Sequence, residues 1–438
     1  DGVFQTPGVE YTLSGNTVSF STAPETGTEI IALIGNDSTI FTPSNNSISG
    51  TKIAGAVVTD AKIAGMAANK LNGALPAVDG SALTNMPSGV TKNASDPATD
   101  TNPSGGVGTM WFNTTSGEMF ACTDATTDEN VWFNVGGGTG DVQPYFYPGL
   151  TSGYAQGGGS TRSDVKDKWS FSSDGNAADA GNITVARSTF SGYSSQTNGY
   201  SAGGRTTGSP NSNIIDKFAY SSDGDSTDVG DLTVETGQAA DASSETHGYT
   251  FGGRDDATGN FICKTTFSVD ANSTDVGDLT FYRYGLSGHS SETHGYASGG
   301  VQTPQGYQKI IEKFTFASDG NATDVGDITT ARGDRTSGNS SLTHGYVAGS
   351  HQGGASGYTN VIDKFTFASD ANATDVGDLT QNKLGMAGAG SFTFGYWAGG
   401  STGGSVNVIE KSSYATDGNA TDVGDLTVGR YLPTGSQI

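Results

Sequence analysis

Several residue types and patterns are scarce in this sequence. Only two cysteines, Cys122 and Cys263, occur among 438 residues, and they lie too far apart to suggest a disulfide framework. Lys and Arg number 21 against 45 Asp and Glu, and the resulting net charge of −24 argues against nucleic acid and anionic membranes as direct partners. No apolar run approaches about 18 residues, so no membrane insertion is expected.

Catalytic motifs are missing as well. The sequence has no Gly-x-Ser-x-Gly turn, no zinc-ligand spacing and no phosphate-binding glycine loop followed by a helix. We therefore expect a protein that is not an enzyme. Two of the 45 carboxylates could still form a glycosidase pair, whose separation a sequence does not reveal, so a glycan-depolymerising enzyme stays as an alternative.

What the chain has in abundance is repetition. A Gly-Tyr pair recurs six times at intervals of 46 to 50 residues, and a fixed period of this size indicates a repeat architecture. The tyrosines are Tyr154, Tyr200, Tyr249, Tyr296, Tyr346 and Tyr396. Each unit contains four short segments that read as strands, and no segment has helical periodicity. Four is the number of strands in one propeller blade. With 33% hydrophobic residues and 67 glycines, a thin core of Tyr and Phe is expected.

The order of elements within a unit resembles kelch-repeat β-propellers. A Gly-Gly pair ends one strand (Gly203-Gly204), an acidic and aromatic strand follows (Asp216 to Tyr220), and a basic residue comes after the last strand. That basic residue is Arg187, Arg283, Arg332 or Arg430. The resemblance implies an all-β, six-bladed propeller over residues 149–438. The tail from Arg430 to Ile438 aligns with the first strand of a blade, which the unit around Tyr154 lacks, so we expect the C-terminal strand to close the ring.

Three smaller regions precede the repeats. Residues 1–44 are predicted to form a small β-module, with a hairpin at Ser14-Gly15-Asn16 and a third strand at 29–34. Residues 45–88 carry isolated Ile and Leu residues that one chain could not bury, so an intertwined multi-chain shaft is expected. Residues 89–148 combine a linker (89–104), a compact β-module with an exposed turn at 115–117, and a glycine hinge.

These N-terminal phrases resemble tail-fibre proteins of tailed bacterial viruses, especially marine ones. The resemblance lies in Pro7 to Asn16, Val78 to Met86, and the module from Gly108 to Asn134. It implies a homotrimeric fibre, located on the virion and attached to other tail or baseplate proteins. The propeller would then bind a host-surface glycan or protein, and a purely structural fibre or decoration is the remaining alternative.

Acidic turns recur in the units, as in Asp223, Asp225 and Asp228, and they raise the question of a metal. Calcium is one interpretation, although the pattern lacks the Gly and Glu of an EF-hand loop. Turn formation by Asp and Asn explains the same residues without a cofactor, and we favour it. His247, His294 and His344 share one repeat position, but Asn198 and Phe394 occupy it elsewhere, so a packing role is favoured over a metal site.

One lysine recurs in every unit at a position that neighbouring blades should cover. These residues are Lys168, Lys217, Lys264, Lys313, Lys364 and Lys411. Because an unpaired buried ammonium is costly, we predict that each forms an ion pair with an aspartate of a Val-Gly-Asp segment, such as Asp231, Asp278 or Asp327. We expect this ladder to be structural.

Candidate receptor-binding residues lie in the connections that differ between units. These connections follow the Gly-Gly pair and the last strand, and in a propeller they share one face. Tyr and Arg side chains suit sugar rings and carboxylates. The candidates are Arg205, Arg254, Tyr282, Arg283, Tyr284, Tyr307, His351, Tyr358 and Tyr431. Arg332-Gly333-Asp334 spells an integrin-binding tripeptide, but Arg332 is the repeat's own basic residue and the motif receives little weight.

Overall fold

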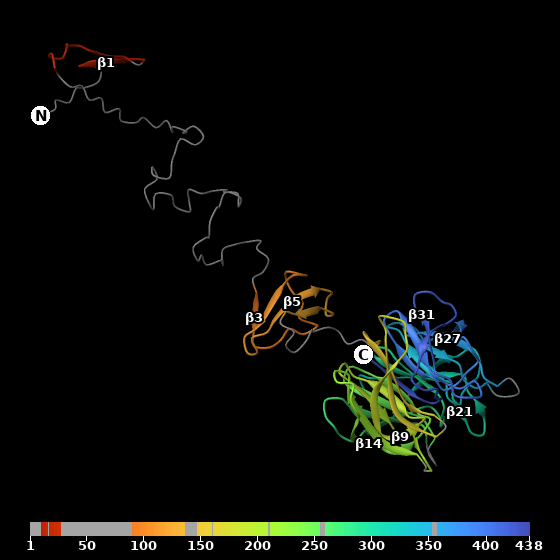
Figure 1. Cartoon of the computed structure of the whole chain (residues 1–438). Helices are drawn as coiled ribbons and strands as arrows, with labels where there is room; N and C mark the ends of the chain where they lie inside the picture. Colours follow the sequence, from red (N-terminus) through yellow and green to blue (C-terminus); the bar gives the residue numbers. More distant parts are fainter. Residues whose placement is uncertain are drawn as a thin grey trace. The chain divides into compact units, whose positions relative to one another are not determined.

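The computed structural model describes residues 10–15, 17–27, 90–135 and 147–438, the last range without 160, 209–210, 255–258 and 353–356. The regular secondary structure of these residues consists of β-strands alone (Figure 1), so the all-β prediction is confirmed for the described part. Within it, no helix exists that could cross a membrane. The chain divides into two units, residues 1–84 and 85–438.

In the first unit, the predicted hairpin is present. Strand β1 (Tyr11–Ser14) pairs with β2 (Thr17–Phe20) in antiparallel register, and Gly15 in the turn has a φ of 57°. Glycine adopts this left-handed conformation without strain. The third strand predicted at 29–34 and the shaft predicted at 45–88 lie outside the described residues.

A four-stranded module occupies residues 90–135. Its strands are β3 (Thr91–Asn93), β4 (Met110–Asn113), β5 (Met119–Asp124) and β6 (Val131–Asn134). Trp111 and Trp132 are buried with edge-to-face rings 5.9 Å apart, and the predicted turn at 115–117 is exposed. The linker predicted at 89–104 is partly wrong, because β3 pairs with β4 and the Ser95 carbonyl accepts the Trp111 indole N–H at 2.9 Å.

Six four-stranded antiparallel sheets make up residues 147–438, one for each repeat, with one short extra strand on the first. The first, inner strands are β33 (Thr434–Gln437), β10 (Ser191–Ser194), β15 (Ala240–Ser243), β19 (Ser287–Ser290), β25 (Ser337–Ser340) and β29 (Ala387–Gly390). The second strands are β7 (Ser152–Gly158), β11 (Asn198–Ala202), β16 (His247–Phe251), β20 (His294–Ser298), β26 (His344–Ala348) and β30 (Phe394–Ala398).

The two outer positions in each sheet follow the same plan. The third strands are β8 (Ser163–Ser170), β13 (Ser212–Ala219), β17 (Phe261–Thr266), β23 (Ile310–Thr315), β27 (Val361–Thr366) and β31 (Val408–Ser413). The fourth strands are β9 (Ala178–Ser188), β14 (Thr227–Thr236), β18 (Thr274–Asp278), β24 (Thr323–Asp327), β28 (Thr374–Asp378) and β32 (Thr421–Asp425). The short strand β12 (Arg205–Thr206) adds to β9, and β21 (Val301–Gln302) pairs with β22 (Gly306–Tyr307).

The C-terminal strand completes the first sheet. β33 pairs with β7, with Ser436 opposite Tyr154, which is the pairing that the sequence predicts (Figure 1, where the C-terminus lies beside the yellow strands). Each inner strand packs against the inner strands of two other sheets, in the cyclic order β33, β10, β15, β19, β25, β29 and back to β33.

The core between the sheets consists of aromatic rings, as expected. Tyr249 stacks on Phe316 of the next sheet at a centroid distance of 4.9 Å, and Tyr396 of the last repeat stacks on Phe171 of the first at 4.8 Å. The glycine of the Gly-Tyr pair has a steric reason: a Cβ on Gly295 would lie 2.4 Å from the ring of Phe314, its partner in the sheet. In the Gly-Tyr pair, the tyrosine therefore supplies one ring of the core, and the glycine leaves the space that a second ring occupies.

Candidate functional site

The antiparallel strand order gives each sheet two ends with different connections. At one end lie the acidic turns between the third and fourth strands, and we call this the turn end. At the other end lie the connection after Gly-Gly and the connection into the next inner strand, and we call this the loop end. Backbone bridges such as Tyr284 to Val301 and Gly333 to His351 bring these two kinds of loop together, as predicted.

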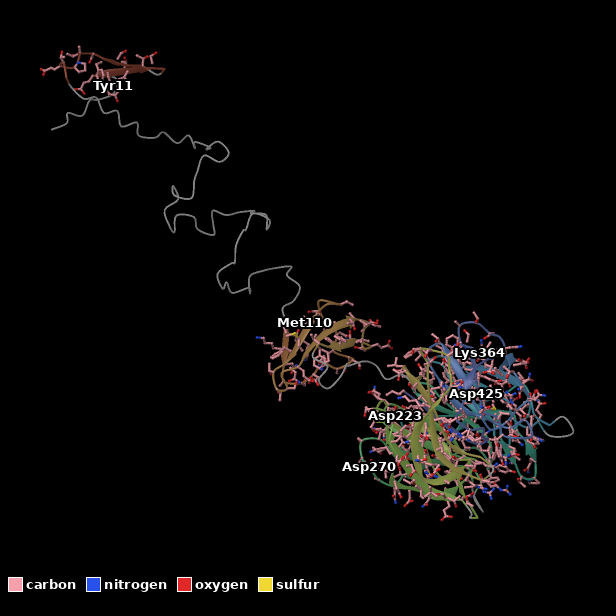
Figure 2. All side chains as sticks on the ribbon, viewed as in Figure 1. Tyr11, Met110, Asp223, Asp270, Lys364 and Asp425 are labelled. Carbon is pink, nitrogen blue, oxygen red and sulfur yellow. The ribbon has the colours of Figure 1, made fainter. Side chains whose placement is uncertain are left out.

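The lysine ladder lies at the turn end, but its predicted partners are wrong. Each lysine bonds the first aspartate of the acidic turn in the next sheet, and no Val-Gly-Asp carboxylate is involved. The pairs are Lys168–Asp223 at 2.7 Å, Lys217–Asp270, Lys264–Asp319, Lys313–Asp370 and Lys411–Asp174 at 2.5 Å, and Lys364–Asp417 at 2.6 Å. The lysines are 19–30% exposed, so they reach the neighbouring turn at the surface and need no buried partner. Asp223, Asp270 and Lys364 are labelled in Figure 2.

Hydrogen bonds explain the other residues of the acidic turns. The Asn321 side-chain oxygen accepts the backbone N–H of Asp278 in the preceding sheet at 3.0 Å, and Asn176 does the same for Asp425 at 3.1 Å. The third acidic residue, such as Asp324, accepts the N–H of the glycine two residues later. In the second repeat, Asp225 takes the asparagine's place and accepts from Asn182. Among the described residues, no three His, Cys, Asp or Glu side chains are grouped to hold a metal ion, at Asp223, Asp225 and Asp228 or elsewhere.

The three aligned histidines do not converge. His247, His294 and His344 each contact the hydroxyl of the preceding threonine through Nδ1, at 2.7–2.8 Å, and each lies near the tyrosine of its own sheet. Partial burial lowers the pKa of each imidazole, and the nearby lysine of the ladder lowers it further. Their role is local packing at the turn end.

A second set of ion pairs lies under the loop end and is fully buried. A basic residue, which lies near the end of the fourth strand in the first sheet and after that strand in the others, bonds a carboxylate on the third strand of the next sheet. The pairs are Arg187–Asp216 at 2.5 Å, Arg332–Asp363 and Lys383–Glu410 at 2.9 Å, Arg283–Glu312, and Arg430–Asp167. Each carboxylate also accepts the hydroxyl of a threonine, such as Thr329 for Asp363. Arg283 and Arg332 are both 0% exposed, so the prediction of Arg283 as a receptor-binding residue is wrong, and the Arg-Gly-Asp tripeptide has no accessible guanidinium.

One junction between sheets is neutral. Between the second and third repeats, Thr236 stands where the other junctions have Arg or Lys, and Cys263 stands where they have Asp or Glu. Cys263 is buried, its pKa is raised by that burial, and its Sγ lies 2.9 Å from the Thr233 hydroxyl. Both charges are absent together, which avoids leaving either one buried without a partner.

The remaining candidate residues form clusters at the loop end. Tyr307 stacks on His351 with centroids 5.4 Å apart, its hydroxyl lies 2.8 Å from His351 Nδ1, and Tyr358 meets the same imidazole edge-on. All three are half-buried, so the rings are held in place and partly open to solvent. They come from the fourth and fifth repeats and form one aromatic platform.

A cationic group stands beside aromatic rings at two further positions. The Arg254 guanidinium lies 5.4 Å from the Tyr284 ring, and Tyr282 is tilted against Tyr284. The Arg335 guanidinium lies 5.6 Å from the Tyr431 ring. The sequence does not single out Arg335, because the equivalent positions of the other five repeats hold Thr, Gln, Gly or Leu and show no pattern. Arg205, a predicted candidate, is half-buried in β12.

The loop end also has a central rim, which the sequence does not reveal. Two residues before each inner strand lies a residue in the left-handed conformation, with φ between 60° and 88°. These rim residues are Thr189, Gln238, Gly285, Arg335, Gly385 and Leu432. Each rim N–H donates to the carbonyl of the rim residue of a neighbouring sheet at 2.7–3.2 Å, so six backbone hydrogen bonds form a closed cycle. Four of the six are not glycine, and such strain persists only where the surroundings enforce it.

All six rim residues line one cavity of about 100 Å³ that extends along the inner strands. Tyr147, which precedes the first sheet, lines the same cavity, and its carbonyl accepts the side-chain amide of Gln437 at 2.9 Å. Gly149 N–H donates to the Gly390 carbonyl at 2.6 Å. Gln437 and Gly390 end their inner strands at the turn end, so the chain enters the six sheets opposite the aromatic platform.

The chain matches no protein-family model and no curated protein. Among solved structures it is similar to that of YjhT, with a TM-score of 0.46 and 10% identity over 58% of this chain and 88% of that one. A likeness at this level carries no information about function.

Proposed function

We propose that this chain is a fibre protein of a tailed bacterial virus, and that its six sheets form a closed, six-bladed, kelch-like β-propeller that binds a host-surface glycan or protein without catalysis. Cyclic strand packing and the closed cycle of rim hydrogen bonds support the propeller. The fibre assignment is supported by the N-terminal phrases that resemble tail-fibre proteins.

The aromatic platform is the observation that carries the binding function. Tyr307, His351 and Tyr358 are held by contacts with one another and remain partly exposed on a scaffold of paired strands. Fixed aromatic faces offer contact area to sugar rings at low entropic cost. The platform lies opposite the point where the chain enters the sheets, which is the end that a fibre would present to a cell.

The virion assignment carries further expectations. We propose a homotrimer held by an intertwined shaft at 45–88, attached to other tail or baseplate proteins and located on the virion. Sedimentation equilibrium of the full chain tests the oligomeric state. A mass three times the 44.6 kDa of the chain supports the proposal, and a monomer at micromolar concentration overturns it.

Incubation of the full chain with a panel of bacterial surface polysaccharides tests receptor binding. Retention of a polysaccharide without shortening is the expected result. Shortening of the polysaccharide would instead identify a depolymerising enzyme. If the polysaccharide is neither retained nor shortened, the structural fibre becomes the better proposal.

Two matched variants locate the binding face. Tyr307→Ala should weaken retention about fivefold or more, since stacking of a flat ligand ring on an aromatic side chain contributes about 1–3 kcal/mol for nucleic-acid bases and a sugar face should approach the lower value. His294→Asn, at the turn end, installs the residue that Asn198 supplies in the second repeat and should leave retention unchanged. Equal effects of the two variants would contradict the assignment of the loop end.

A further inference from the structure

Asp241 is an exception among the inner strands. The second residue of every other inner strand is glycine, namely Gly192, Gly288, Gly338, Gly388 and Gly435. A Cβ on Gly338, Gly388 or Gly435 would lie 1.8–2.2 Å from a neighbouring carbonyl oxygen, so the close approach of the inner strands requires glycine there. Asp241 instead places a carboxyl group in the cavity, where its Oδ2 accepts the Gly192 N–H at 3.0 Å. The fold does not need this carboxylate, since five repeats do without one.

Among the residues that the structure describes, no Lys or Arg forms an ion pair with the Asp241 carboxylate. Of the residues that line the cavity, only Asp241 and Arg335 are charged, and Arg335 lies at the rim beside Asp334, with Nε 3.5 Å from Oδ1. Burial raises the pKa of Asp241 to about 7, and the Gly192 N–H opposes this shift. The ionisable groups that interact with it, Tyr147 and Tyr193, are themselves neutral because burial raises their pKa values.

The rim offers an acceptor without a described donor, the side-chain oxygen of Gln238. Gln238 is 9% exposed, its Nε2 donates to Asp334 Oδ1 at 3.1 Å, and no described residue donates a hydrogen bond to its Oε1. Buried side-chain acceptors without a hydrogen-bond donor are uncommon in proteins, so this one calls for an explanation. Gln238 is also one of the four rim residues held in the left-handed conformation without being glycine. The same cavity is therefore lined by a carboxylate that forms no ion pair with a described residue, Asp241, and by an amide oxygen without a described donor, Gln238 Oε1.

The size of the cavity limits what can enter it. A volume of about 100 Å³ corresponds to roughly seven to ten waters by the usual allowance for each water, which is the scale of one compact sugar unit. Tyr147 lines the turn-end part of the cavity, so a ligand would enter from the rim. Leu432, Pro433 and Met386 supply apolar contacts along the wall.

We propose that the cavity binds one amino-sugar unit, whose protonated primary amine pairs with the Asp241 carboxylate while its hydroxyls meet Gln238 and Arg335 at the rim. The ammonium is the feature that this site selects, because it supplies the charge that Asp241 lacks. This proposal rests on the proposed function, since it names the part of a host glycan that enters the propeller axis.

Titration of the full chain with glucosamine, glucose and N-acetylglucosamine at pH 7, where most of the amine is protonated, followed by saturation-transfer NMR, tests the proposal. Glucosamine should bind at least about tenfold more tightly than the other two, because a hydrogen bond between charged groups contributes more than one between neutral groups. Equal binding of the three sugars, or binding of none of them, overturns the proposal.

Two variants at one position separate charge from shape. Asp241→Asn keeps an acceptor for Gly192 and removes the charge, and Asp241→Gly reproduces the other five repeats. Both should lose the preference for glucosamine, and a preference that survives in either variant contradicts the role of Asp241. Asp241→Gly should also melt no lower than the parent at pH 8. The sign follows from linkage: a carboxyl whose pKa is raised on folding loses stability as pH rises toward that value.

Failure of this proposal and failure of receptor binding give different results. If the full chain retains a polysaccharide through Tyr307 and shows no preference for glucosamine, only the cavity proposal falls. If glucosamine binds through Asp241 and no polysaccharide is retained, the receptor function falls and the cavity assignment stands.

Discussion

Ion pairs link neighbouring sheets at both ends of the repeats, but in opposite surroundings. At the turn end, Lys313 and Asp370 are 26% and 56% exposed, and at the loop end Arg283 and Glu312 are both 0% exposed. Exposed pairs contribute little because water solvates the separated charges almost as well. Buried pairs are needed as pairs, since either charge alone would be left without solvation. The comparison shows that position in the sheet, and not the type of residue, decides what a charge contributes.

The neutral junction at Thr236 and Cys263 extends the comparison. It shows that the six sheets tolerate one junction without charges when both members change together. The turn-end ladder has no such exception, and all six of its pairs are present. In the buried set of ion pairs, the two charges of a junction are thus either both present or both absent.

Breaking one buried pair should give the largest effect. Arg283→Ala leaves Glu312 buried without its partner and should lower the free energy of unfolding by about 3–5 kcal/mol, measured by urea denaturation. The double variant Arg283→Thr with Glu312→Cys copies the neutral junction and should recover most of that loss. A double variant as unstable as the single one would show that the junctions are not equivalent.

A buried histidine should give the next largest effect. His289 on β19 is fully buried, with Nδ1 3.0 Å from the Asn339 carbonyl and Nε2 2.7 Å from the Ser298 hydroxyl, and burial lowers its pKa to about 4. Between pH 6.5 and 4 the unfolded chain binds the extra proton, so stability falls as pH falls through this window. At pH 5 the expected loss from this group is about 2 kcal/mol.

The variant His289→Ala isolates that group, because Ala242 and Ala389 occupy the same position in two other inner strands. Denaturation at pH 7 and at pH 5 should show a smaller loss of stability on acidification in this variant than in the parent. Equal losses would assign the acid sensitivity to the half-buried histidines at the turn end.

Breaking a turn-end pair should give the smallest effect. Lys313→Met removes the partner of Asp370 and should change the free energy of unfolding by less than about 1 kcal/mol. In 1 M NaCl the difference between variant and parent should shrink further, because salt screens exposed charges. A loss above 2 kcal/mol that persists in high salt would contradict the distinction between the two ends.

Much of the fold could be predicted from the sequence. The period of the Gly-Tyr pairs locates the repeat sheets, and the alignment of the tail with Arg187 to Ser195 predicts the pairing of β33 with β7. Local patterns of this kind are sufficient because strand alternation and turn residues act within a few positions of the chain. The prediction of a linker at 89–104 is partly wrong, because the pairing of β3 with the later strand β4 cannot be read from local turn residues.

The candidate site was only partly predictable. The sequence indicates the variable loops and the tyrosines of the aromatic platform, since Tyr307 and Tyr358 interrupt otherwise regular repeats. It does not distinguish the buried Arg283 from the exposed Arg254, because both follow a strand in a polar context. An alignment of the six inner strands could have singled out Asp241 among five glycines.

The sequence by itself determined the repeat, the strands and the residues that recur, because these depend on local spacing and turn chemistry. Only the tertiary structure decided which lysine meets which aspartate, which arginines are buried and where the rim residues enclose a cavity. Those contacts join residues of different repeats, about 30 to 265 positions apart, and only the packing of one sheet against another brings them together.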